Sequence, residues 1–173
     1  MLKGMLNTGN PHPTLRELIL GGVRRASPQQ EAEFNKTHPY FGEVIGDTAY
    51  INEQKLREGG STGNFVGDML FGEALHNLDK TSPYWYNRLK EAANKDKEVQ
   101  KWKKDSFQYA KLNGETRPID EWWDVSRFDQ VIGGYLLGGK DANIHTMRSW
   151  SKDLPFGTTF REELEEFKQA LDR

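Results

Sequence analysis

Helix-start signals constrain the fold of this chain more than any other feature. Thr14-Leu-Arg-Glu17 and Thr159-Phe-Arg-Glu162 each place a threonine three residues before a glutamate, which is the pattern of a capping box. Ser27-Pro28-Gln29-Gln30 combines such a box with a proline at the first helical position, and Ser82-Pro83 repeats the serine–proline start. Almost no segment alternates apolar and polar residues as a half-buried strand would. The sequence therefore predicts a mainly α-helical fold.

The expected organisation is a single compact helical domain over residues 14–173 behind an extended N-terminal arm. A chain of 173 residues fits one ordinary domain and can bury a core. We expect about seven to nine short helices in it. Residues 1–13 hold two glycines and two prolines without apolar periodicity, which favours an extended arm. Residues 43–51, EVIGDTAYI, form the only segment with moderate strand propensity, and Gly46-Asp47 interrupts it.

Two long helices are expected in the second half of the chain. Asp96 is placed to cap a helix that runs to about Leu112, with Gly114 as its stop. The last helix should follow the capping box at Thr159. Its apolar residues lie on one face, at positions Phe160, Leu164, Phe167 and Leu171.

The glycine-rich stretch over residues 57–78 is expected to lie at the centre of the molecule. From Asn64 onwards it predicts a helix, whose apolar face is formed by Val66, Met69, Leu70, Ala74 and Leu78. Gln130–Asn143 aligns with Asn64–Asn77 without gaps, and two aligned glycines flank an aligned leucine in both stretches. The second copy belongs to a helix that Ser126 is expected to cap. Because glycine within a helix costs about 1 kcal/mol relative to alanine, we expect these two helices to compensate by packing closely together.

Composition narrows the possible chemistry. The net charge of −2 gives no general reason to expect a polyanionic partner, and the absence of cysteine excludes disulfides and thiolate catalysis. No apolar run approaches a membrane span, and the N-terminus lacks the apolar core of a signal peptide. The four histidines, at positions 12, 38, 76 and 145, show no short ligand spacing, so neither a metal site nor a cofactor is predicted.

The loop Gly59-Gly60-Ser61-Thr62-Gly63 matches the G-x-S-x-G pattern of a nucleophile elbow. That elbow needs a buried strand before it, whereas residues 52–58 are polar and predict a helix. A glycine-rich helix entry, capped by Ser61, Thr62 or Asn64, is the better interpretation. Its backbone N–H groups are also a candidate anion-binding site.

Glu73 is the best candidate for an acid–base residue. It lies at the edge of the apolar face, next to Leu70 and Ala74, where desolvation favours a neutral carboxyl. His76 follows within side-chain reach, and Asp68 is a candidate second carboxylate. The alternative is a structural glutamate paired with His76 or a lysine.

Residues 95–111 interleave six lysines with aromatic residues, which is a pattern of nucleic-acid binding. Lys101, Trp102 and Lys104 are the candidate contacts. The competing interpretation is a solvated helix face over a buried stripe, because three acids lie among the lysines. Trp122 and Trp123 are candidates for a binding platform, with an ordinary core position as the alternative.

Residues 127–139, RFDQVIGGYLLGG, and 154–167, LPFGTTFREELEEF, resemble segments of small uncharacterised proteins of tailed phages. The resemblance covers about a quarter of the chain and carries no catalytic motif. It implies a location in the virion or the host cytoplasm.

Three functions remain open from the sequence. The leading hypothesis is a small helical structural subunit of a larger assembly, such as a phage virion, that engages other protein subunits through the N-terminal arm and an aromatic surface. The second is a lysozyme-like hydrolase of cell-wall glycans, with Glu73 as general acid and with Ser61, Asn64, Asp68 and His76 lining the site. The third is a nucleic-acid-binding protein that uses the basic helix at 95–111.

Overall fold

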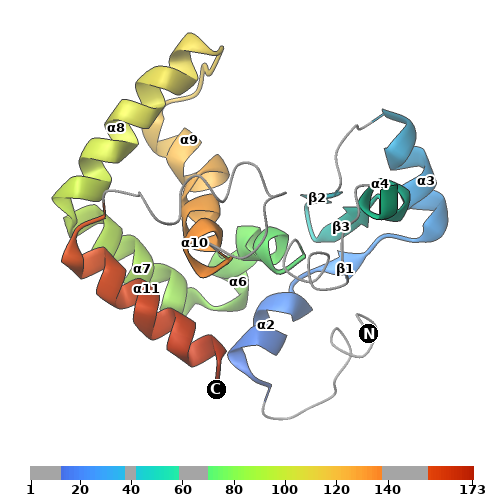
Figure 1. The fold of residues 1–173 in the computed structure, drawn as a ribbon, viewed down its shortest axis with the longest axis horizontal. Coiled ribbons are helices and arrows are strands. Elements are labelled where there is room, and N and C mark those ends of the chain that lie inside the picture. The colour runs from blue at the N-terminus through green and yellow to red at the C-terminus, as the bar shows by residue number, and fades with distance from the viewer. Residues whose placement is uncertain (1–12, 38–41, 59–69, 138–155) are drawn as a thin grey trace. The chain divides into compact units, whose positions relative to one another are not determined.

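The computed structural model describes residues 13–37, 42–58, 70–137 and 156–173. The chain divides into an N-terminal unit, Met1–Ser82, and a C-terminal unit, Pro83–Arg173 (Figure 1). Within the described ranges there are nine α-helices and one 3-10 helix, so the predicted mainly α-helical fold is confirmed. The sequence predicts no boundary after Ser82, where the serine–proline pair indicates only a helix start. Residues 1–12 of the predicted arm lie outside the described part.

A small three-stranded sheet belongs to the N-terminal unit. Its strands are β1 (Arg24–Arg25), β2 (Gly42–Ile45) and β3 (Thr48–Ile51), in the order β1-β3-β2. β2 and β3 are antiparallel, and β1 is parallel to β3. The expected interruption at Gly46-Asp47 is the turn of this hairpin, where Gly46 has a φ of 66°, as the first central residue of a tight hairpin turn requires. β1 was missed because two arginines carry no strand pattern.

Three helices of the N-terminal unit begin at side-chain caps, and the sequence predicts the caps of the first two. They are α2 (Leu15–Gly21), α3 (Pro28–Thr37) and α4 (Glu53–Glu58). Thr14 and Glu17 form both hydrogen bonds of the predicted capping box, and so do Ser27 and Gln30. Asn52 caps α4 by accepting the backbone N–H of Lys55 at 3.0 Å.

The central stretch departs from the single helix expected for it. Residues 70–74 are helical, but the path then tightens into the 3-10 helix η1 (Leu75–Asn77) before α6 (Leu78–Thr81). At this point the Asn77 side-chain amide donates to the Gly46 carbonyl of the hairpin at 3.3 Å. We interpret the change from α-helical to 3-10 geometry as a consequence of this contact. The expected burial holds: Leu70, Ala74 and Leu78 are all in the core.

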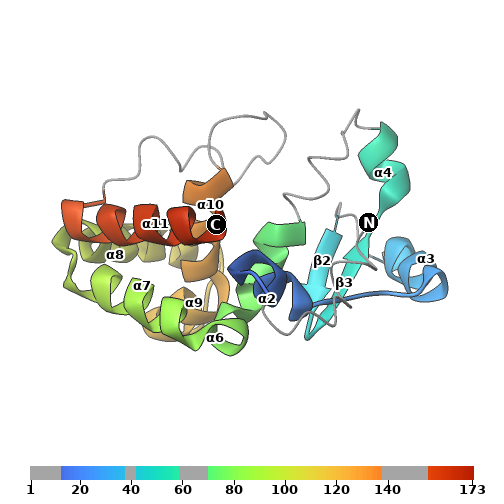
Figure 2. The same ribbon diagram turned by 90° about the horizontal axis from the view of Figure 1, so that it is seen from below.

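The C-terminal unit is helical throughout its described residues. Its helices are α7 (Pro83–Lys95), α8 (Lys97–Leu112), α9 (Ile119–Ser126), α10 (Phe128–Leu137) and α11 (Thr158–Leu171). α7 and α11 lie side by side (Figures 1 and 2), with the rings of Trp85 and Phe167 5.3 Å apart. The predicted apolar face of α11 is buried in full.

Asp96 links two helix starts of this unit. As predicted, it caps α8, accepting the N–H groups of Glu98 and Val99. Its carboxylate also accepts the N–H groups of Gly157 and Phe160 at the start of α11. The capping box expected at Thr159 is therefore wrong: Thr159 lies inside α11, and a side chain from another helix provides the cap.

The second glycine-bearing stretch begins in α10. Ser126 ends α9, and Arg127 separates the two helices, so Ser126 is not the expected cap of α10. Val131, Ile132 and the two glycines that follow are buried. Residues 70–78 and α10 belong to different units, and their expected packing against each other stays a prediction. None of the described helices is long and apolar enough to cross a membrane.

Candidate functional site

Glu73 and His76 form the part of the predicted acid–base site that the structure describes. Glu73 Oε2 lies 3.3 Å from His76 Nε2, as their spacing on one helical turn predicts. The two side chains keep 23% and 31% of their surface exposed. The pair therefore lies at the surface of the N-terminal unit rather than in an enclosed apolar site. Asp68 and the loop residues Ser61, Thr62 and Asn64 lie outside the described residues.

The described residues contain no group of three or more histidine, aspartate or glutamate side chains that could hold a metal ion. The prediction that no metal is bound stays a prediction.

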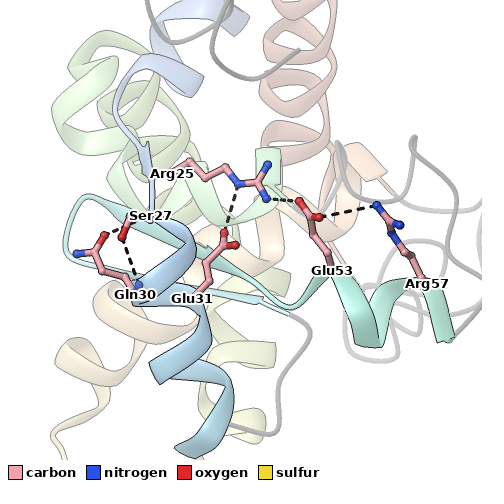
Figure 3. A network of polar contacts seen from close by, with 6 residues as sticks. All are labelled: Arg25, Ser27, Gln30, Glu31, Glu53 and Arg57. Atoms are coloured by element: carbon pink, nitrogen blue, oxygen red, sulfur yellow. Dashed lines mark hydrogen bonds and ion pairs between the residues drawn. The ribbon is translucent and has the colours of Figure 1, made fainter.

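A network of charged residues, which the sequence did not indicate, joins β1, α3 and α4 (Figure 3). Arg25 donates from Nε to Glu31 Oε1 at 3.2 Å, and its terminal nitrogen pairs with Glu53. Arg57 lies 3.9 Å from the other oxygen of Glu53. Burial lowers the pKa of Arg25, but hydrogen bonds to Glu53 and Glu31 outweigh it and leave the pKa above its usual value.

The network balances its own charges. Two arginines face two glutamates, and the neighbouring hollow, lined by residues of α4 alone, is open and shallow. It ties a strand to two helices that are distant in sequence. We therefore interpret it as a structural tie of the N-terminal unit. No sequence signal could have found it, because 28 positions separate Arg25 from Glu53.

The tryptophans proposed as a binding platform lie in the core of the C-terminal unit. Trp122 and Trp123 are buried, and Trp123 has no exposed surface. Trp102 packs edge-on against Trp123 and Phe156, at ring separations of 5.9 and 6.3 Å. Trp122 and Trp123 therefore have no free face for a sugar or a base, and the described structure favours the core interpretation for both, while Trp102 is half-buried.

The lysines of α8 divide into two groups. Lys103 is buried, and its Nζ donates to Asp120 Oδ1 at 2.7 Å. That hydrogen bond lowers the pKa of Asp120. The candidate residues Lys101 and Lys104 are exposed, and neither lies on the face of α8 that carries Trp102.

The end of α8 presents two large apolar side chains to solvent. Tyr109 is 71% exposed and Leu112 is 86% exposed. Positions three apart on a helix are neighbours, so the two side chains form one apolar surface. Sequence periodicity missed it because Tyr109 continues the stripe that begins at Val99 and Trp102.

No family model, curated protein or solved structure matches the chain.

Proposed function

We propose that the chain is a small helical interaction subunit of a larger assembly, such as the virion of a tailed phage. The observation that supports it most directly is the exposure of Tyr109 and Leu112. A leucine that leaves 86% of its surface in water contributes little to the stability of its own unit. Adjacent exposed apolar side chains are typical of surfaces that a partner covers.

The resemblance to tailed-phage proteins supports the same function. Its two segments, residues 127–139 and 154–167, contribute to α10 and α11, where they supply core residues such as Phe128 and Phe160. The likeness is therefore one of architecture, which suits a structural subunit. The N-terminal arm remains the second proposed contact with neighbouring subunits.

The test combines light scattering with photo-crosslinking. Full-length protein should form species above the monomer mass. A shortened chain that begins at Thr14 should form fewer, and so should the variant Tyr109→Ser/Leu112→Ser. Val125→Ser is the matched control, because Val125 is exposed elsewhere in the same unit.

A photo-reactive amino acid at position 112 should also give adducts of discrete mass in the native source, whereas one at position 168 should not. Monomers in every form, together with equal or absent adducts at both positions, would contradict the proposal.

A hydrolase of cell-wall glycans is the second candidate, and the contact between Glu73 and His76 is its proposed acid–base pair. The same contact fits a structural glutamate, and the test below separates the two. In this function Glu73 protonates the leaving oxygen while His76 orients its carboxyl. The test is the loss of turbidity of purified cell walls. Glu73→Gln should abolish the activity while Glu98→Gln, an exposed change in the other unit, leaves it unchanged. Equal activity in both variants would remove the assignment.

A further inference from the structure

Four lysines form one row along the outer face of α8. Successive residues of an α-helix are rotated by about 100°, so spacings of four, three and seven residues return to the same face. All four side chains are exposed. They define the lysine row: Lys97, Lys101, Lys104 and Lys111.

None of the four lysines forms an ion pair with a carboxylate of the described residues, whereas the other lysines of α7 and α8 do. Lys90 pairs with Asp124, Lys95 with Glu91 and Lys103 with Asp120. The acids of α8, Glu98 and Asp105, lie along one flank of the row. On the helix, only Lys101 has acids at the attractive spacings of three and four positions, Glu98 and Asp105, and the Lys111 ammonium lies 5.9 Å from the centre of the Phe107 ring. Like charges at these spacings disfavour each other, so most of the charge of the row lacks a carboxylate partner within the unit.

We infer that the lysine row binds the phosphate backbone of a nucleic-acid duplex. The row extends over about 21 Å, since 14 residues separate its ends at about 1.5 Å each. Over that length one strand of a duplex presents about six phosphates. A straight row of flexible cations suits this regular line of charge, and it needs no contact with base edges.

The packing of the aromatic residues favours a duplex over a single strand. Binding of single strands uses aromatic side chains on which bases stack. Trp102 and Phe107 instead turn towards the core, where Trp102 meets Trp123 and Phe107 lies 5.3 Å from Trp122. Tyr109 is exposed, but it lies on another face of α8 than the lysine row. The lysine row can form contacts to phosphates, so binding to a duplex should be independent of base sequence and steeply dependent on salt.

The experiment measures the fluorescence anisotropy of a labelled 20-base-pair DNA duplex titrated with full-length protein, from about 50 mM to about 200 mM salt. With up to four phosphates neutralised, a plot of log K against log salt should have a slope of about −3 to −4, and affinity should fall about 100-fold over this range. Replacing all four row lysines by glutamine should weaken binding at the lowest salt at least 10-fold and flatten the slope.

The matched control replaces four other exposed lysines by glutamine: Lys36, Lys80, Lys95 and Lys168. The control variant has the same net charge as the row variant. If the lysine row itself binds the duplex, the control should bind nearly as tightly as the wild type. Circular dichroism checks that both variants fold. Equal losses in the two variants, or no binding at the lowest salt, would overturn the inference. Tighter binding to a single strand, or binding only to vesicles that contain phosphatidylserine, would overturn it as well.

Discussion

The Asp96 carboxylate accepts the backbone N–H of Gly157 at 3.1 Å, across 61 positions of sequence. The same carboxylate accepts the N–H of Phe160 and two N–H groups of α8. Four backbone donors at two helix starts, which would otherwise be left without partners, thus share one buried side chain. Asp96 therefore links the start of α8 to the start of α11, and the stability of the C-terminal unit should depend on this side chain.

Asp96→Ala should destabilise the C-terminal unit by about 1–4 kcal/mol, because it removes two caps that are each worth about 0.5–2 kcal/mol. Asp96→Asn should cost less, since the amide retains one acceptor oxygen. Urea unfolding followed by tryptophan fluorescence measures this, as all five tryptophans lie in the C-terminal unit. Asp105→Ala, an exposed change on the same helix, should stay within about 0.5 kcal/mol of wild type. If Asp96→Ala destabilises the unit no more than Asp105→Ala does, Asp96 does not cap both helices.

Gly157→Ala should destabilise the same unit by about 1–3 kcal/mol. A Cβ at this position would lie 2.7 Å from both carboxylate oxygens of Asp96, which four hydrogen bonds hold in place. The cost should shrink in the Asp96→Ala background, because the obstructing group is then absent, and a double-mutant cycle measures that coupling. Strictly additive effects would show that the two residues do not interact.

Local signals predicted the starts of most helices but not the interactions between distant segments. Thr14, Ser27 and Asp96 cap helices where the sequence places them, because capping depends on residues three or four positions apart. Thr159 failed because its role passed to Asp96, which local spacing does not reveal. The 3-10 turn at Asn77 has the same origin, in a contact with Gly46.

The candidate site was predicted less completely than the fold. The contact between Glu73 and His76 follows from helical spacing and was expected. The sequence leaves open whether Trp122 and Trp123 are buried, because it shows the same aromatic pair whether the side chains face a partner or the core. The structure buries both. The sequence does not show which lysines of α8 lack an ion pair, because the partner of Lys103, Asp120, lies 17 positions away.

Gly46→Ala should weaken the hairpin of the N-terminal unit by about 1–2 kcal/mol, since the φ of 66° at this position is unfavourable for residues with a Cβ. Hydrogen exchange of the β3 amides should accelerate accordingly. Gly21→Ala is the contrasting control. It lies in α2 with open space around the new methyl group, and it should stabilise the unit by up to about 1 kcal/mol. Slower exchange in Gly46→Ala would contradict the assigned turn.

Glu115 should titrate well below the other glutamates. Hydrogen bonds from the Arg117 side chain, with further bonds from the backbone of Arg117 and Thr116, lower the pKa of Glu115 from 4.5 to about 2. A carboxyl whose pKa is lowered by folding contributes stability above its unfolded pKa and loses that contribution as the pH falls towards the folded pKa. The contribution of Glu115 should therefore be complete at neutral pH and disappear between pH 4.5 and about 2.

Carboxyl NMR measures this titration directly. The Glu115 resonance should have its midpoint near pH 2, and Arg117→Gln should return the midpoint towards 4.5. In urea unfolding, Glu115→Gln should be less stable than wild type at neutral pH, and the difference should close as the pH falls through this window. A Glu115 midpoint that Arg117→Gln leaves unchanged would show that the guanidinium is not the cause, and a stability difference that widens in acid would reverse the assigned sign.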